Sequence, residues 1–187
     1  MVAVVYGALE PILSLRLADY DLGSTYTGLV FGVEAIFYMI STFMVPYVVP
    51  EWVESRVTLI TSTFLMSFAT VLVGPFYTEQ SLVAMIIGLA FSGFFISFMM
   101  IPNISEMMQA IKVAYPSLAS SDHTNSMLSG MFNGFYGFGQ ALGPLLGSYL
   151  YEATGENFRL TMNIVGGICL VFSLLYFCFA NGCQAFS

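Results

Sequence analysis

Six long apolar runs, separated by short polar segments, make up most of the chain. The runs cover residues 2–18, 24–48, 57–77, 81–105, 126–151 and 158–180. A bilayer core about 30 Å thick needs about 20 apolar residues of helix, and lipid does not tolerate unpaired backbone. None of the runs alternates apolar and polar residues as the strands of a membrane barrel do. The pattern predicts an all-α membrane protein whose residues 1–187 form a single bundle of six transmembrane helices.

The polar segments between the runs contain the residues expected at helix ends. The longest segment, Glu106 to Thr124, is the one expected to hold structure of its own, and it ends in Ser121, Asp122 and Thr124. Any of these three side chains is a suitable cap for the fifth helix. The first run, residues 2–18, is short for a membrane span. We therefore expect the chain to begin partway along a helix.

Composition and charge support a membrane location and exclude two classes of protein. Of the 187 residues, 58% are hydrophobic and 8% are charged, and the mean hydropathy is +0.84. Soluble domains carry about 25% charged residues, so a water-soluble globule is excluded and an integral multi-pass protein in a lipid bilayer is predicted. The basic residues Arg16, Arg56, Lys112 and Arg159 are scattered. They form no cationic stripe for nucleic acid, and they do not orient the protein in the membrane.

The sequence carries no motif of a membrane enzyme, a metal site or a cofactor site. It contains no Gly-x-Ser-x-Gly, His-Glu-x-x-His or Walker loop. Cys169, Cys178 and Cys183 lack the paired spacing of a disulfide framework or a zinc site. His123 lies among capping residues in a polar segment. We therefore predict that the protein is not an enzyme and that it uses no cofactor and no metal.

Glycines recur at four-residue spacing in the fifth run, at Gly139, Gly143 and Gly147, with Pro144 among them. In lipid, helices associate largely through close backbone contact, which small residues permit. This face is therefore predicted to pack against another helix. The second run contains one glycine pair with the same four-residue spacing, Gly28 and Gly32.

One carboxyl, that of Glu34, lies near the middle of the second run, and Tyr38 follows one helical turn later. A carboxylate at the bilayer centre costs about 2.5–3.5 kcal/mol on insertion scales, so such residues usually face a cavity or a partner. We expect Glu34 to be a protonatable group that lines a cavity, with the Tyr38 hydroxyl beside it. The alternative is a structural glutamate that is hydrogen-bonded to a neighbouring helix.

Two further glutamates lie near prolines. Glu10 precedes Pro11 in the first run, and Glu106 follows Pro102 and Asn103 in the fourth. Proline weakens a helix, and transporters place interrupted helices at equivalent positions of internal repeats as binding sites. If the six spans are two units of three, the first helix of each unit carries a proline near a glutamate. For Glu106 the alternative is a helix end at the aqueous boundary.

Polar side chains also recur at helical spacing in the fifth run, at Asn133, Tyr136 and Gln140. Residues three and four apart lie on one helix face, so these three form a ridge that lipid would not favour. The ridge is a further candidate for substrate or proton binding.

These motifs together resemble a known family. In order along the chain they are Leu9-Glu10-Pro11, Gly28-Leu29-Val30-Phe31, Gly74-Pro75, Ile101-Pro102 with Glu106, and Gly143-Pro144 with Gly147. The pattern resembles the C-terminal six-helix half of a major facilitator superfamily transporter, nearest the vesicular amine transporter-like branch of drug/proton antiporter type. The resemblance covers essentially the whole chain.

The resemblance implies a proton-coupled antiporter that moves small organic cations, such as monoamines or polyamines, by alternating access. Glu10 would be a cation or proton site, and residues 139–147 would control closure. The substrate cavity would form with an N-terminal six-helix half or a second chain. The chain departs from the family pattern at Glu34 and in its acidic connector, Pro46 to Arg56. The alternative function is a truncated, non-transporting membrane protein that pairs with or regulates a full-length transporter.

Overall fold

The computed structural model describes residues 1–20, 23–49, 53–75, 81–117 and 121–179. Within these residues the regular structure is entirely helical. The six helices are α1 (Val2–Ala18), α2 (Ser24–Val48), α3 (Ser55–Val73), α4 (Leu82–Ala114), α5 (Asp122–Ala153) and α6 (Phe158–Phe179). The predicted all-α, six-helix architecture is confirmed.

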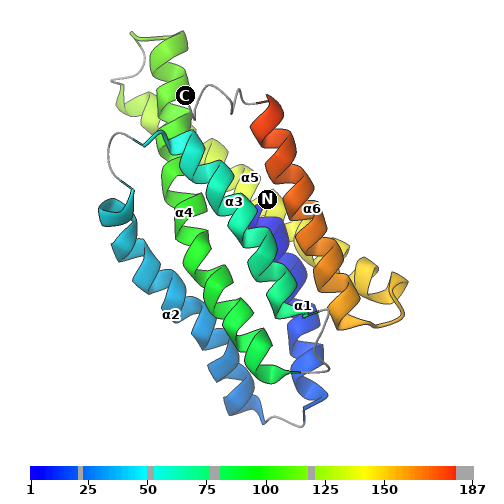
Figure 1. The fold of residues 1–187 in the computed structure, drawn as a ribbon. Coiled ribbons are helices and arrows are strands. Elements are labelled where there is room, and N and C mark those ends of the chain that lie inside the picture. The colour runs from blue at the N-terminus through cyan, green and yellow to red at the C-terminus, as the bar shows by residue number, and fades with distance from the viewer. Residues whose placement is uncertain (21–22, 50–52, 76–80, 118–120, 180–187) are drawn as a thin grey trace.

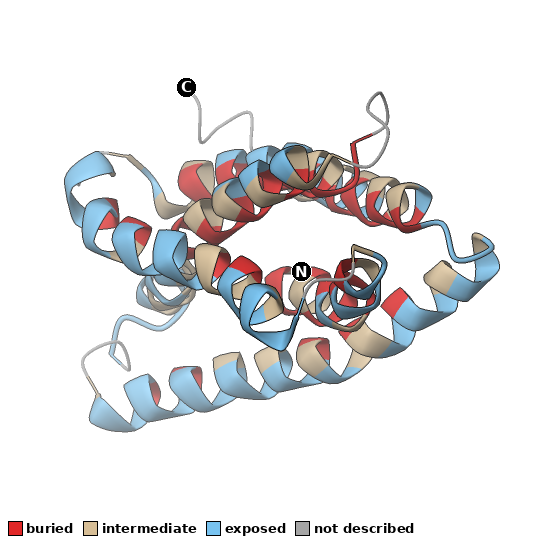
Figure 2. Ribbon diagram, turned by 90° about the horizontal axis from the view of Figure 1, so that it is seen from below, coloured by how far each residue is buried: buried red, intermediate tan, exposed pale blue. Residues whose placement is uncertain are grey.

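The helices form a bundle with two layers. Figure 1 shows α2, α4, α3 and α6 side by side in that order, with α1 and α5 behind them. The extensive contacts are those of α4 with α2 and α3, of α3 with α6, and of α1 with α5. Figure 2 shows that buried residues lie mainly on the helix faces that point into the bundle, and exposed residues on the outer faces.

Part of the packing has the symmetry expected of two three-helix units, although the extensive contact of α4 with α3 has only a weak counterpart in the contact of α1 with α6. If α1, α2 and α3 correspond to α4, α5 and α6, the contact of α1 with α5 is the counterpart of the contact of α4 with α2. Each pairing joins the first helix of one unit to the second helix of the other.

The core is formed by aliphatic and thioether side chains that α1 contributes in largest number. Ile12, Leu13 and Leu17 of α1 are almost completely buried, as are Met66 of α3 and Met162 of α6. Apolar residues that point into a bundle gain little from leaving lipid, so their contribution is chiefly close packing. The core therefore contains more of α1 than of any other described helix.

Several helix ends differ from the apolar runs in the sequence. α4 continues through Glu106 to Ala114, nine residues beyond residue 105, and α5 begins at Asp122 rather than 126. Polar residues extend a helix freely once it has left the lipid, so hydropathy does not mark these ends. α3 spans Ser55–Val73, and Gly74 and Pro75 follow it. Residues 76–77 and 180 of the predicted runs, and Cys183, lie outside the described residues.

Four of the described helices, α2, α3, α4 and α6, are long and apolar enough to cross a membrane. α1 has only 17 residues, and α5 carries many glycine and polar residues on its 32-residue length. At 1.5 Å per residue, α5 is nevertheless about 48 Å long. The chain is an integral, multi-pass membrane protein.

The expected interruptions at proline do not occur. α1 runs through Pro11 and α4 runs through Pro102 as continuous helices. α2 and α5 likewise contain Pro46 and Pro144 within their bounds. A proline removes only one backbone hydrogen bond, and packing against neighbouring helices holds the remaining turns in place.

Candidate functional site

A pocket of about 300 Å³ opens between α1, α3, α4, α5 and α6. Its lining is dominated by methionine and aromatic side chains: Met1, Met99, Met100, Met107, Phe132, Phe135, Tyr136, Phe172 and Tyr176. Among the described residues that line it, none has a charged side chain. Thioether and aromatic groups are polarisable and adaptable, so the pocket suits an organic molecule with an apolar body.

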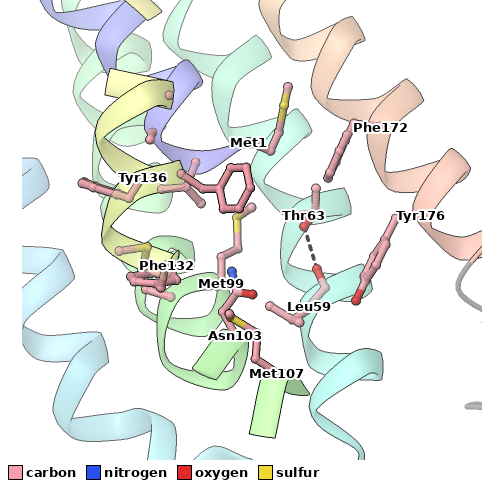
Figure 3. A pocket seen from close by; sticks show the side chains of 15 residues that line it. Met1, Leu59, Thr63, Met99, Asn103, Met107, Phe132, Tyr136, Phe172 and Tyr176 are labelled. Carbon is pink, nitrogen blue, oxygen red and sulfur yellow. Dashed lines mark hydrogen bonds between the residues drawn. The ribbon is translucent and has the colours of Figure 1, made fainter. Parts of the chain in front are cut away.

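Three helices provide most of this lining (Figure 3). α4 presents Met99, Asn103 and Met107 from successive turns of one face, because residues four apart lie above one another on a helix. Side chains of α5 and α6 lie on either side of this row in Figure 3, with Tyr136 on α5 and Tyr176 on α6. A guest in the pocket would contact aromatic rings from two helices.

Of the polar ridge predicted on α5, only Tyr136 lines the pocket. Asn103 of α4 also lines it. Gln140 lies one turn beyond Tyr136, and its Nε2 donates a hydrogen bond of 3.1 Å to the Tyr136 hydroxyl. Asn133 is exposed and lies outside the pocket lining. Gln140 therefore orients the ring that a guest would meet.

Glu34 is buried at the junction of α1, α2 and α4. It is 6% exposed, and Ser92 of α4 donates a hydrogen bond of 2.8 Å from Oγ to the carboxyl oxygen Oε1. The Tyr6 hydroxyl of α1 lies near the same carboxyl, on a side from which it could donate to it. No basic side chain pairs with Glu34 in the contacts found among the described residues.

Tyr38 does not have the place beside Glu34 that the sequence predicts. It is 41% exposed, and the partners of Glu34 come from other helices. Four residues advance a helix by about 400°, so Tyr38 is rotated by about 40° from Glu34, enough to turn it outward. The Tyr38 backbone carbonyl instead accepts hydrogen bonds from Ser41, Thr42 and Ser97.

Glu10 lies one helical turn after Tyr6 on α1 and is exposed. It is within electrostatic range of both Tyr6 and Glu34. Tyr6 is in turn within electrostatic range of Tyr136, which lines the pocket. One tyrosine thus lies near both candidate carboxyls and near the pocket wall.

Glu106 is held in an ion pair at the end of the bundle where α3 begins. Arg56 donates from Nε and from a terminal nitrogen to the same carboxylate oxygen, at 2.9 and 2.7 Å. The side chains are 35% and 16% exposed for Arg56 and Glu106, respectively. Glu106 does not line the pocket, although its neighbour Met107 does. Binding of a cation by Glu106 would require this ion pair to open.

The glycine-rich face of α5 packs against α1. A Cβ added at Gly143 would lie 2.7 Å from the Gly7 Cα and 2.8 Å from the Val4 carbonyl oxygen. Gly139 and Gly147 are equally close to Ala3 and Ala8 of α1, and Pro144 contacts the position where Gly7 would carry a side chain. Backbones this close leave no space for a side chain, so this face determines how α1 and α5 fit together.

The second glycine pair does not pack in the same way. Around Gly28 and Gly32 of α2 there is open space, with no atom within 4 Å of the point where a Cβ would lie. Gly130, Gly134 and Gly137 on the other face of α5 are equally open. These glycines therefore lie on outer surfaces of this bundle.

Sequence reasoning missed Ser92 and Tyr6 at the carboxyl, and the methionines and α6 aromatics at the pocket. Small polar residues in a membrane helix signal helix contacts, so Ser92 beside Gly93 carried a usable signal. Tyr6 lies one turn before Glu10 and was also accessible to a spacing argument. No sequence signal marked Met107, Phe172 and Tyr176 as pocket residues, because a methionine or aromatic residue in an apolar run usually contacts lipid or core.

Comparison with known proteins identifies the family. The family model of the Major Facilitator Superfamily matches residues 1–181. The chain is 26% identical over 163 residues to the mouse protein "MFS-type transporter SLC18B1" from Mus musculus, an alignment that covers 84% of this chain and 35% of the relative. The Homo sapiens protein of the same name is 27% identical over 169 residues, covering 80% and 34%. No solved structure matches the chain.

The chain therefore spans about a third of the length of these curated relatives. The family match runs through all six helices, including the glutamate and proline motifs of α1 and α4 and the glycine face of α5. Members of this family are transporters rather than enzymes. The chain belongs to the Major Facilitator Superfamily.

Proposed function

We propose that the chain is one half of a proton-coupled secondary transporter for small organic cations, with Glu34 as a proton site. The observation that carries the proposal is the environment of Glu34. It is a buried carboxyl that accepts a hydrogen bond from the neutral Ser92 hydroxyl, with the Tyr6 hydroxyl nearby as a second group able to donate. A carboxylate held only for structure is usually fixed by a basic side chain or by backbone N–H groups, whereas hydroxyls can adapt to either charge state.

The pocket supports a cation with an aromatic or other apolar body as the substrate class. Aromatic faces attract organic cations, with about 0.5–2 kcal/mol per well-placed ring. Tyr136 and Tyr176 provide such rings on α5 and α6, and Asn103 offers one polar contact. A linear polyamine needs several acidic partners along its length, and the described lining offers none. Of the two expected classes, a monoamine therefore fits this half better.

The carboxyls Glu10 and Glu34 lie outside the pocket lining but near Tyr6. Opposite charges attract strongly across a low-dielectric interior, so an ionised carboxylate here would favour entry of a cation into the bundle. Loss of the cation would in turn favour return of a proton. This reciprocal preference is the physical basis of proton-for-cation exchange.

A partner six-helix bundle is proposed to cover the outer faces of α2 and α5. These are the helices with the fewest buried residues relative to their length, and both expose open glycines. Gly28 and Gly32 on α2, and Gly130 and Gly134 on α5, would let helices of the partner approach closely. Substrate would then bind between the two bundles, and alternating access would expose it to either side.

Transport by the complete protein tests this proposal, with tryptamine as the probe cation. Glu34→Gln keeps the shape and hydrogen bonding of the side chain but removes its ionisation. We expect uptake driven by a pH gradient to fall at least tenfold, while counterflow exchange without a gradient continues. The matched control is Ser97→Ala, which removes a buried hydroxyl between the same two helices but leaves the carboxyl and its partners in place. Its gradient-driven uptake should stay within about twofold of the unmodified protein.

The 187-residue chain alone, without a partner half, should give no uptake in the same vesicles. Undiminished gradient-driven uptake by Glu34→Gln would show that Glu34 is structural, and the coupling role would then pass to Glu10. Transport by the isolated chain would contradict the proposed partner half.

A further inference from the structure

Ser92 makes two hydrogen-bonding contacts with a single hydroxyl group. Its Oγ lies 2.8 Å from the Glu34 carboxyl oxygen Oε1 and 2.9 Å from the backbone carbonyl oxygen of Leu89. Ser92 is 2% exposed, so water does not compete at this position. A hydroxyl has one hydrogen to donate and two lone pairs to accept with, so it can donate fully to only one of these oxygens at a time.

The two acceptors differ in how much they need that hydrogen. The Leu89 carbonyl lies within α4, where the helix itself provides a backbone donor four residues later. A serine that bonds back to a carbonyl of the preceding turn is a common resting arrangement in apolar helices. The ionised Glu34 carboxylate, in contrast, depends on the donors around it, because a buried charge without hydrogen bonds is costly.

We propose that Ser92 is a two-way hydrogen-bond partner that lets Glu34 gain and lose its proton with no movement of the helices. This inference rests on the proposed function, in which Glu34 is the proton site, and it assigns the residue that makes both charge states of that site stable. Ser92 is a positioning residue: it never gives up its own proton.

The two states use the same pair of atoms. When Glu34 is ionised, the Ser92 hydroxyl donates to Oε1. When Glu34 binds a proton, its carboxylic O–H donates to the Ser92 Oγ across the same 2.8 Å, and the Ser92 hydrogen turns to the Leu89 carbonyl 2.9 Å away. One proton is added, one hydroxyl rotates, and both Oε1 and the Ser92 Oγ stay paired.

Other groups around the carboxyl do not provide this reversal. The titratable groups that influence Glu34 among the described residues are Tyr6 and Glu10, both on α1. Tyr6 can donate to the carboxylate, but no second acceptor for its hydrogen, such as Leu89 provides for Ser92, is found among the contacts of the described residues. On α4, Gly93 lies against the backbone of Glu34, which holds the two helices in contact and fixes the short distance between Ser92 and the carboxyl.

Ser97 provides a matched control on the same helix. It is also fully buried in the contact of α4 with α2, and its hydroxyl bonds the Tyr38 carbonyl and Ser41. No contact joins it to a carboxyl among those found for the described residues. Removing either serine hydroxyl creates the same small loss of volume, but only one change affects Glu34.

The test is infrared difference spectroscopy of the complete transporter in lipid nanodiscs across a pH series. The C=O stretch of protonated Glu34 is identified by its loss in Glu34→Gln. We define the midpoint as the pH at which this band has half of its full intensity. We expect Ser92→Ala to raise the midpoint by about one pH unit or more, because the ionised form loses a charge-assisted donor. Ser97→Ala should leave the midpoint unchanged. Ser92→Cys leaves no cavity and has only a weak S–H donor, so it should shift the midpoint in the same direction. This second variant is used if Ser92→Ala does not fold.

An unchanged midpoint in Ser92→Ala and Ser92→Cys would overturn the inference, as would an equal shift in Ser97→Ala. Two further outcomes distinguish failure of the proposed function from failure of this inference about Ser92. If Ser92→Ala shifts the band but Glu34→Gln keeps gradient-driven uptake, the Ser92 assignment stands and the coupling role of Glu34 fails. If no band titrates in the unmodified protein, both fail.

Discussion

Glu34 and Tyr136 belong to different helices, and Tyr6 lies within electrostatic range of both. A cation at the pocket wall and a proton at the carboxyl would therefore act on one shared neighbour. Charges separated by low-dielectric protein influence each other over several ångströms, so no contact between substrate and Glu34 is needed. The proposed coupling would therefore be an electrostatic interaction between two nearby sites.

A change of the Tyr136 ring should weaken substrate binding. Tyr136→Leu removes an aromatic face from the pocket, and a lost cation–π contact of about 1.4 kcal/mol would raise the KM for tryptamine about tenfold. Tyr136→Phe keeps the ring and loses only the hydroxyl that accepts from Gln140, so its KM should change about threefold or less. Equal KM values for the leucine and phenylalanine variants would show that the ring does not bind the cation.

The sequence was sufficient to single out Glu34, because a lone carboxyl in the middle of an apolar run is costly and therefore conspicuous. It was not sufficient to find the partners of that carboxyl. Ser92 and Tyr6 lie on α4 and α1, and their position depends on how three helices pack. Tyr38 was expected at the carboxyl because it is near in sequence, and the helix rotation over four residues turned it outward.

Among the helices, the contact of α1 with α5 depends directly on residue size. Both helices present glycine where they meet, at Gly7 and at Gly143, and Ala8 lies against Gly147. Most apolar side chains of the short first helix are buried inside the bundle and not on its outer surface. Its place in the bundle therefore depends on this close packing.

Gly143→Ala should destabilise the bundle by about 1–3 kcal/mol, the usual cost of overpacking. The added Cβ would meet backbone atoms of Gly7 and Val4 at 2.7 and 2.8 Å, and backbone cannot move aside as a flexible side chain can. Gly137→Ala, on the open side of the same helix, is the control and should not lower stability, because alanine is the better helix former and its Cβ meets nothing within 4 Å. Thermal unfolding in detergent measures both, and equal melting temperatures for the two variants would contradict this account of the contact.

Helix positions were predictable wherever lipid dictates them, and less so at helix ends. The apolar runs at residues 2–18 and 24–48 coincide with α1 and α2. α4 passes out of the apolar run at Glu106, where the ion pair with Arg56 satisfies its charge, and it continues as a polar helix. The four-residue glycine spacing predicted a contact face on α5 but did not name α1 as its partner.

In the whole molecule, the two layers leave most of α2 and one face of α5 without neighbours among the described residues. Which helices pair could not be read from the sequence, because all six are apolar and lipid gives no preference among them. The proposed partner half would cover these faces and close the pocket against solvent. Exclusion of water would strengthen the electrostatic interaction between cation and carboxyl, so the proposed coupling would require both halves.

The most direct measurement of coupling is the release of protons when substrate binds. Tryptamine is added at saturating concentration to the complete transporter in weakly buffered detergent solution, and the pH change is followed with an indicator dye. Exchange at Glu34 predicts release of protons that approaches one per bound cation at a pH where the site is protonated, and loss of this release in Glu34→Gln with tryptamine binding retained. Binding without proton release, or release that persists undiminished in Glu34→Gln, would contradict the central claim that Glu34 carries the exchanged proton.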